Sequence, residues 1–235
     1  MEIRGTSILV TGASRGLGAA LGRALGAAGA KLVLVARDAA ALERVAREIR
    51  ENGGEAHAIG ADVSKAEAAT RIAGSAAALV GPIDIVIHNA SSLGPVPLAP
   101  LSETSDAAFE EALATNLVGP FRLTRALAGA MALRGRGLVV HITSDAATNA
   151  YPRWGAYGVA KAGFEHLGRI WAAELGEAGV RFLNLDPGEM DTQMHRDAMP
   201  EADPATLARP AVVAERIVAL LRGELPPSGT RLEVR

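Results

Sequence analysis

Two side chains with complementary acid–base chemistry lie about one helical turn apart in this sequence. Tyr157 and Lys161 are four positions apart, so a helix would stack them on one face. An ammonium beside a phenol makes the phenol a better proton donor and acceptor near neutral pH. Ser144 ends the apolar run that begins at Gly137, and a strand end there can bring its hydroxyl next to the phenol. The same spacing is common on solvated helix faces, so the pair alone does not establish catalysis.

The composition excludes several other chemistries. The chain has 235 residues, 49% of them hydrophobic, which is enough to bury a substantial core in one domain. The absence of cysteine excludes disulfides, thiolate metal sites and cysteine nucleophiles. A net charge of −2 gives no broad attraction to nucleic acid or to anionic membranes. The polar N-terminus and the lack of a long apolar run predict a cytoplasmic protein without a membrane span.

Metal and hydrolase chemistry are also disfavoured. No cluster of histidines and carboxylates has metal-ligand spacing, so we predict no metal. His141 lies within an apolar run and is expected in the core, whereas His57 and His166 are expected at the surface. No Gly-x-Ser-x-Gly segment is present to form the nucleophile turn of a serine hydrolase.

Short apolar runs alternate with longer amphipathic stretches along the whole chain. Continuous apolar runs indicate strands buried on both faces, hence a parallel sheet with helices on either side. The pattern predicts a single α/β domain over residues 1–235, with a Rossmann-type doubly wound parallel sheet. The expected strands are 7–10, 31–36, 55–60, 83–88, 138–142, 180–185 and 230–234, and the expected helices are 17–28, 39–52, 65–80, 106–133, 157–177 and 210–222.

A glycine-rich stretch from Thr11 to Gly18 follows the first expected strand and opens the first expected helix. Glycines permit a tight turn there and let the backbone approach a phosphate closely. The helix N-terminus adds free N–H groups and a positive dipole. This strand–turn–helix context predicts a dinucleotide-binding site, with the spacing Gly-x-x-x-Gly-x-Gly.

With these motifs the chain resembles the short-chain dehydrogenase/reductase family over nearly its whole length. Further matching segments, in order and register, are Asp62-Val63, Asn89-Ala90, the set Asn116, Ser144, Tyr157 and Lys161, and Pro187-Gly188 with Thr192. The chain departs from the family pattern at His88, usually asparagine, and at Ser91, usually glycine; Asp145 is also uncommon after the serine. A looser similarity is to the sepiapterin and benzil reductase group, whose substrates carry adjacent carbonyls.

The resemblance implies an NADPH-dependent carbonyl reductase or alcohol dehydrogenase for a small ketone, diketone or aldehyde. Tyr157 would protonate the carbonyl oxygen during reduction, and Ser144 would hydrogen-bond the same oxygen. Lys161 would bind the nicotinamide ribose and lower the pKa of Tyr157, and Asn116 would hold a water that links Lys161 to solvent. The implied cofactor contacts are Gly12, Ser14, Arg15, Gly16, Leu17, Gly18, Arg37, Asp62, Val63, Asn89, Ala90, Tyr157, Lys161, Pro187, Gly188, Met190 and Thr192.

The end of the second expected strand bears on the choice of cofactor. Enzymes that select NAD usually place a carboxylate there, but this chain has Arg37, followed by Asp38. A guanidinium pairs bidentately with a 2′-phosphate, and Arg15 in the glycine turn can reach the same group. We therefore favour NADP(H) over NAD(H). Two alternatives stay open: both arginines are ordinary surface charges, or a register shift turns Asp38 toward the ribose and favours NADH.

The remaining expectations concern the substrate and the partners. The expected pocket residues are Ser91, Leu93, Asp145, Trp154 and Met194. Residues 189–209 have no strong periodicity and are expected to form a substrate lid. By resemblance, the helices at 106–133 and 157–177 would pack against a second subunit in a dimer or tetramer. The alternative function is an NADP(H)-binding sensor on the same fold, although a sensor gains nothing from keeping all four catalytic groups.

Overall fold

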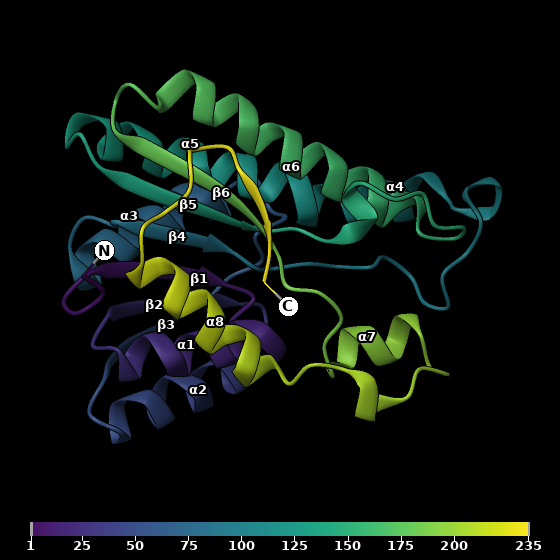
Figure 1. The fold of residues 1–235 in the computed structure, drawn as a ribbon, viewed down its shortest axis with the longest axis horizontal. Helices are drawn as coiled ribbons and strands as arrows, with labels where there is room; N and C mark the ends of the chain where they lie inside the picture. The colour runs from purple at the N-terminus through teal and green to yellow at the C-terminus, as the bar shows by residue number, and fades with distance from the viewer. Residues whose placement is uncertain (1, 235) are drawn as a thin grey trace.

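Parallel strands connected by helices organise the computed structural model, which describes residues 2–234 (Figure 1). Its sheet has seven strands in the order β3-β2-β1-β4-β5-β6-β7, which confirms the predicted Rossmann-type architecture. Met1 and Arg235, the ends of the predicted domain, lie outside the described residues. The strands are β1 Ser7–Thr11, β2 Lys31–Ala36, β3 Glu55–Gly60, β4 Ile85–His88, β5 Gly137–Ile142, β6 Val180–Asp186 and β7 Arg231–Glu233. The helices are α1 Gly16–Ala27, α2 Ala39–Glu51, α3 Ala68–Val80, α4 Asp106–Leu113, α5 Gly119–Leu133, α6 Gly155–Leu175, α7 Gln193–Ala198 and α8 Pro210–Arg222.

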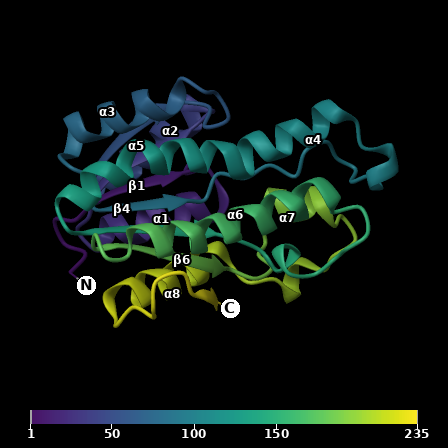
Figure 2. The same cartoon turned by 90° about the horizontal axis from the view of Figure 1, so that it is seen from above.

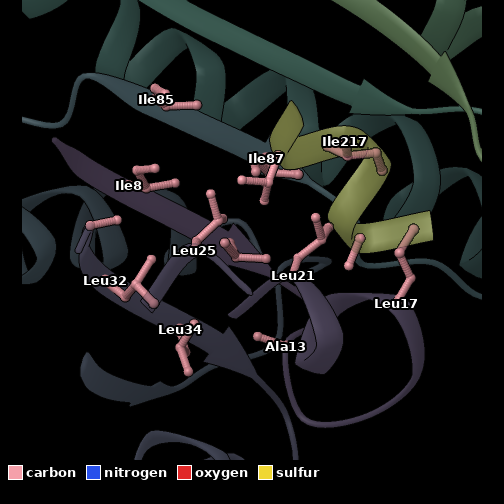
Figure 3. Packing of buried hydrophobic residues seen from close by; sticks show 14 of the residues in the cluster. Ile8, Ala13, Leu17, Leu21, Leu25, Leu32, Leu34, Ile85, Ile87 and Ile217 are labelled. Carbon is pink, nitrogen blue, oxygen red and sulfur yellow. The ribbon is translucent and has the colours of Figure 1, made fainter. Parts of the chain in front are cut away.

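Both faces of the sheet are buried, which explains the continuous apolar runs. On β1, Ile8 belongs to a core cluster with residues of α1, α2 and α8, while its neighbour Leu9 joins α3 and α5 on the opposite face. Figure 3 shows the first cluster, where Leu21 of α1 and Ile217 of α8 lie over Ile87 of β4. Strands β1 to β6 each therefore contribute apolar side chains to two cores rather than one.

The predicted boundaries are accurate where a turn signal ends the apolar run. The strands β2 and β3 and the helix α8 have the predicted bounds. The expected helix at 106–133 is instead three pieces, because a π-helical turn, Ala114–Val118, separates α4 from α5. The helix α3 begins only at Ala68, since Asp62 accepts hydrogen bonds from Ser64 in a local turn that precedes it.

All strands end at one edge of the sheet, and the expected lid lies at that edge. Figures 1 and 2 show α7 apart from the two helical layers, beyond the ends of the strands and on the same side as α4. The expected lid thus contains a short helix, which Thr192 caps by accepting a hydrogen bond from the backbone of His195 at 3.2 Å. No helix among residues 2–234 is long and apolar enough to cross a membrane.

Two histidines lie in register inside the sheet. His88 of β4 pairs with His141 of β5, and their rings meet edge to face with centroids 5.5 Å apart. His88 shares a hydrogen bond of 2.9 Å with the hydroxyl of Thr124 on α5, and His141 stacks on Phe164 at 4.0 Å. Burial lowers the pKa of His88 to about 3 and holds the pKa of His141 well below its ordinary value. The prediction of a core position for His141 is confirmed, and the unusual His88 has a partner on α5.

These buried histidines make the fold sensitive to mild acid. Below about pH 6.5 the unfolded chain takes up protons that the folded chain excludes, so the free energy of unfolding should fall as the pH decreases toward about 4. Each histidine contributes a slope of up to about 1.4 kcal/mol per pH unit. Denaturant unfolding across this range measures the slope. His88→Gln should remove about half of it, whereas His166→Gln, at an exposed position, should leave it unchanged. Stability that does not vary with pH in this range would contradict the prediction.

Candidate active site

The glycine turn after β1 leaves no room for side chains. Gly12 has a φ of 68°, and a Cβ atom there would lie 2.7 Å from the Cα of Ala90. A Cβ at Gly18 would lie 2.3 Å from the carbonyl oxygen of Gly12. The N-terminus of α1 follows without a side-chain cap, so its N–H groups are open to an anion. The turn thus has the backbone cradle that the glycine spacing predicted.

Hydrogen bonds from the end of β4 hold this turn in place. The hydroxyl of Thr11 accepts from the backbone N–H groups of both Asn89 and Ala90, each at 3.1 Å. The amide of Asn89 donates to the carbonyls of Thr11 and Gly12 at 3.0 and 3.2 Å. The two halves of the sheet are therefore joined by side chains where the strand order reverses, between β1 and β4.

The expected catalytic residues come together from three elements. Ser144 lies just beyond β5, Tyr157 and Lys161 lie in the first half of α6, and Asn116 lies in the π-helical turn. Tyr157 and Lys161 are 7% and 2% exposed, and the ammonium lies 5.6 Å from the centre of the phenol ring. Lys161 donates a hydrogen bond of 2.8 Å to the carbonyl of Ile142. The hydroxyls of Ser144 and Ser91 are the hydrogen-bonding neighbours of the Tyr157 phenol.

Ser91 connects the phenol to Asn116. The Ser91 hydroxyl donates to the Asn116 side-chain oxygen at 2.8 Å, and the backbone N–H of Ser92 donates to the same oxygen at 3.0 Å. The Asn116 amide group donates back to the carbonyl of Ser92 at 2.7 Å. Asn116 therefore fixes the loop after β4, with the unusual Ser91 placed between it and Tyr157. The water-holding role implied by the resemblance stays a prediction.

Burial dominates the protonation of both central groups. It raises the pKa of Tyr157 to about 12, although hydrogen bonding with the hydroxyls of Ser144 and Ser91 acts in the opposite direction. Burial also lowers the pKa of Lys161 to about 7, while the negative charge of Asp186 raises it. We expected Lys161 to lower the pKa of Tyr157, but the net shift is upward, because burial of the phenol is the largest effect and burial also brings the pKa of Lys161 down to about 7. The phenol is consequently protonated at neutral pH and can act as an acid.

An apolar wall lies against the phenol. Leu93 and Ala146 form a buried cluster with Tyr157, and Trp154 meets the phenol edge to face with ring centroids 5.6 Å apart. Met194 and Ala198 of α7 pack on this cluster. Four expected pocket residues, Ser91, Leu93, Trp154 and Met194, are thus gathered around the phenol. The fifth, Asp145, accepts hydrogen bonds from Ser144 at 3.1 Å and from Tyr151 at 2.8 Å.

The expected lid, residues 189–209, is closed at its base. An isolated parallel bridge joins Met190 to Ala208. The N–H of Asp191 donates to the carbonyl of Ala208 at 3.0 Å, and the N–H of Ala208 donates to the carbonyl of Glu189 at 3.2 Å. Residues 191–207 therefore form a loop anchored at both ends beside the sheet, and this loop carries α7.

The segment between β6 and α7 runs back to the glycine turn. The N–H of Gly188 donates to the Asp186 carboxylate at 3.0 Å, which orients the Pro187-Gly188 bend. The methyl group of Thr192 lies 3.5 Å from the position that a Cβ would take at Gly16. Met190 packs against the core cluster that contains α1. The expected cofactor contacts after β6, Met190 and Thr192, thus lie beside those of the glycine turn after β1.

A charged cavity of about 410 Å³ opens at the ends of β2 and β3. Its lining includes Arg37 and Asp62, together with the cations Lys65 and Arg71. Burial raises the pKa of Asp62, but hydrogen bonds from Ser64 and the nearby charges of Arg37 and Lys65 outweigh it, so the net shift is downward. The carboxylate of Asp38 caps α2 by accepting from the N–H of Ala41 at 2.9 Å. The Asp38 carboxylate is thus hydrogen-bonded to the backbone of α2, the helix that it caps.

Two of these cavity residues, Lys65 and Arg71, were absent from the predicted contacts. Which way their side chains point depends on where α3 begins. The sequence predicts a start at residue 65, whereas the helix begins at Ala68. The feature of the sequence that could have identified them is their positive charge close to Asp62, an expected cofactor contact. Among residues 2–234, no group of three or more histidines and carboxylates is arranged to hold a metal ion.

Comparison with known proteins gives a consistent family. Residues 6–203 match the family model described as short chain dehydrogenase. Galactitol 2-dehydrogenase (L-tagatose-forming) of Cereibacter sphaeroides is 38% identical over 195 residues, which cover 82% of this chain and 74% of the relative.

Solved structures agree over almost the whole length. A metagenomic short-chain oxidoreductase in complex with NADP has 33% sequence identity and a TM-score of 0.83, and the match covers 99% of each chain. A 7α-hydroxysteroid dehydrogenase complexed with NADH and 7-oxo glycochenodeoxycholic acid has 27% identity and a TM-score of 0.86, over 99% of this chain and 94% of that one. Proteins similar to this chain thus use either nicotinamide cofactor.

The Thr11 hydroxyl can be tested without changing side-chain shape. Thr11→Val removes the acceptor for two backbone N–H groups in a site where Thr11 is 1% exposed. Since unsatisfied buried donors are costly, the free energy of unfolding should fall by about 1–3 kcal/mol. Thr11→Ser restores the hydroxyl and should recover most of this loss. Chemical denaturation measures both variants, and equal stabilities of the valine and serine variants would contradict the assignment.

Proposed function

The chain belongs to the short-chain dehydrogenase family and is an NAD(P)-dependent oxidoreductase, and we propose that it is an NADP(H)-dependent carbonyl reductase or alcohol dehydrogenase. Its substrate would be a small ketone, diketone or aldehyde, reduced to the alcohol, or the alcohol in the reverse direction. The observation that carries this proposal is the phenol of Tyr157, which is buried beside Ser144 and against the apolar wall.

The side chains around the phenol supply the acid–base part of the reaction. Ser144 and Tyr157 would both hydrogen-bond the carbonyl oxygen and so hold the carbonyl carbon in a fixed direction. Tyr157 would then give its proton to that oxygen as negative charge develops on it, and Lys161 would supply positive charge nearby. NADPH, when bound, supplies the hydride. The apolar wall of Leu93, Trp154 and Met194 would exclude water from the site and favour a substrate with apolar substituents.

The residues present fit a dinucleotide along the carboxyl edge of the sheet. The backbone cradle between Gly12 and Gly18 and the open end of α1 suit the pyrophosphate. The bend at Pro187-Gly188 lies close to the glycine turn through Thr192, which suits the nicotinamide end. Asp62 at the charged cavity suits the adenosine end.

The charged cavity favours a 2′-phosphate over a free ribose hydroxyl. Three cations, Arg37, Lys65 and Arg71, line it beside two carboxylates, Asp62 and Glu67, which leaves a net positive charge that suits an anionic group. The carboxylate that would select NADH, Asp38, is occupied as the cap of α2. Arg15 is exposed beside the turn and is available to the same phosphate.

We further propose that the protein is cytoplasmic and self-associates to a dimer or tetramer through α4–α5 and α6. Val159 and Ile170 on α6 are 49% and 42% exposed, and Leu133 at the end of α5 is 92% exposed. Packing of these helices against a second copy would cover such side chains.

Turnover tests the reaction class. The purified protein should oxidise NADPH in the presence of at least one aldehyde, ketone, vicinal diketone or β-ketoacyl thioester, followed by nicotinamide absorbance. Tyr157→Phe should lower kcat by about 10²–10⁴-fold because the proton donor is gone, with NADPH affinity retained. The matched control is Tyr151→Phe, which removes the only other phenol of the chain; this phenol is exposed and reaches the site only through Asp145, so kcat should fall far less than in Tyr157→Phe.

Retained turnover in Tyr157→Phe would point to a different acid. Tight NADPH binding by the wild type without turnover on any of these compounds would favour the alternative, an NADP(H)-binding sensor.

Cofactor choice is tested at Arg37. Arg37→Asp replaces a cation of the cavity with a carboxylate, so NADPH affinity should fall by about ten- to a hundredfold, and NADH affinity should fall much less. Arg44→Asp, with the same charge change at an exposed position of α2, is the control. Calorimetric titration of both cofactors gives the constants, and an unchanged NADPH affinity in Arg37→Asp would reject the NADP(H) assignment.

A further inference from the structure

One guanidinium from the last strand connects three elements of the active site. Arg231 of β7 donates from Nε to Glu165 Oε2 at 3.2 Å and from Nη2 to Asp186 Oδ2 at 2.8 Å. Its Nη2 also approaches the backbone carbonyl of Ser144 at 3.4 Å. The planar guanidinium can serve all three acceptors at once because its five N–H groups point in fixed directions.

Each of these partners adjoins a group of the proposed reaction. Glu165 lies one helical turn after Lys161 on α6, and it also accepts from the hydroxyl of Thr143 at 3.2 Å. Asp186 ends β6, and its other oxygen accepts from the N–H of Gly188, in the bend expected to hold the nicotinamide. The third acceptor is the backbone carbonyl of Ser144 itself.

Both carboxylates are buried, and Arg231 is the cation that pairs with Asp186, whereas Glu165 also pairs with Arg169. The side chains of Glu165 and Asp186 are each 2% exposed, and that of Arg231 is 19% exposed. A buried carboxylate that loses its cation is strongly disfavoured in its ionised form, and its surroundings rearrange or it takes up a proton. The positions of the three attached elements therefore depend on the guanidinium.

We propose that Arg231 is a positioning residue for hydride transfer, which sets the relative placement of Ser144, the catalytic helix α6 and the Pro187-Gly188 bend. The expected effect on kcat rests on the proposed function. The expected effect on binding of the nicotinamide end of the cofactor does not require turnover. Arg231 touches neither the phenol nor the expected substrate, so it acts through the three elements that it joins.

Arg231 also compensates the charge that Asp186 exerts on the reacting groups. The negative charge of Asp186 raises the pKa of both Tyr157 and Lys161 on α6. Asp186 acts on Tyr157 and Lys161, and it is held by Arg231 and by the N–H of Gly188. Two further carboxylates pair with the same guanidinium: Glu165 on α6 and Glu233 on β7. Removal of the guanidinium charge would leave Asp186 uncompensated next to Lys161 and Tyr157.

Two substitutions at Arg231 separate its charge from its geometry. Arg231→Lys keeps the charge but cannot bridge two carboxylates and a carbonyl with one ammonium. Arg231→Met keeps much of the length but removes the charge as well. Arg169→Met is the matched control, since Arg169 is half-exposed and pairs with the same Glu165 from one turn further along α6.

Binding and kinetics are measured on each folded variant. In both Arg231 variants, kcat should fall about ten- to a hundredfold. NADPH should bind about tenfold more weakly, whereas 2′-phospho-ADP-ribose, which lacks the nicotinamide, should bind within about twofold of the wild type. The basic limb of the kcat–pH profile should move upward in Arg231→Met and remain near the wild type in Arg231→Lys. Arg169→Met should resemble the wild type in all three measurements.

Several results would overturn the proposal. These are a kcat and NADPH affinity within twofold of the wild type in Arg231→Lys, an equal loss in Arg169→Met, or an equal loss of affinity for the nicotinamide-free fragment. Failure of both Arg231 variants to fold would also overturn it, because Arg231 would then hold the fold rather than the site. If the wild type reduces no carbonyl compound, the proposed function fails, and the comparison of NADPH with the fragment still decides the role of Arg231.

Discussion

The parallel direction of the strands is the constraint on which the rest of the structure depends. Parallel neighbours require a crossover through a helix each time, so every strand ends at the same edge of the sheet. The glycine turn, Asn89, Ser144 and Pro187 all follow strand ends, and they meet although they are far apart in sequence. The hydrogen bonds between Thr11 and the end of β4 hold this meeting point where the strand order reverses.

The sequence predicts the sheet well because burial on both faces leaves a strong local pattern. The runs at 31–36 and 55–60 follow glycines and have the predicted bounds, and Ser144 and Lys161 lie beside Tyr157, with Asn116 joined to this group through Ser91. The π-helical turn at Asn116 has no such pattern, since the composition of 106–133 is helical throughout. The helix α7 escaped prediction because six residues are too few to display a helical period.

Electrostatic properties could not be predicted in the same way, because they depend on how much solvent reaches a group. Tyr157 and Lys161 at helical spacing suggest a lowered phenol pKa, but burial of both groups acts more strongly and raises it. Arg231 is a similar case. In the sequence it is a charged residue of an expected edge strand, and only the pairing of β7 with β6 brings its guanidinium to two buried carboxylates.

The bridge between Met190 and Ala208 separates two parts of the molecule that evolution can change independently. Because the ends of the intervening loop are already held together, insertions or deletions within it alter the closure entropy only slightly. The sheet and the catalytic helix do not have to move when the loop is exchanged. The part of the loop beyond Thr192, which packs on the Tyr157 cluster through Met194 and Ala198, can therefore change in sequence while the sheet keeps its form.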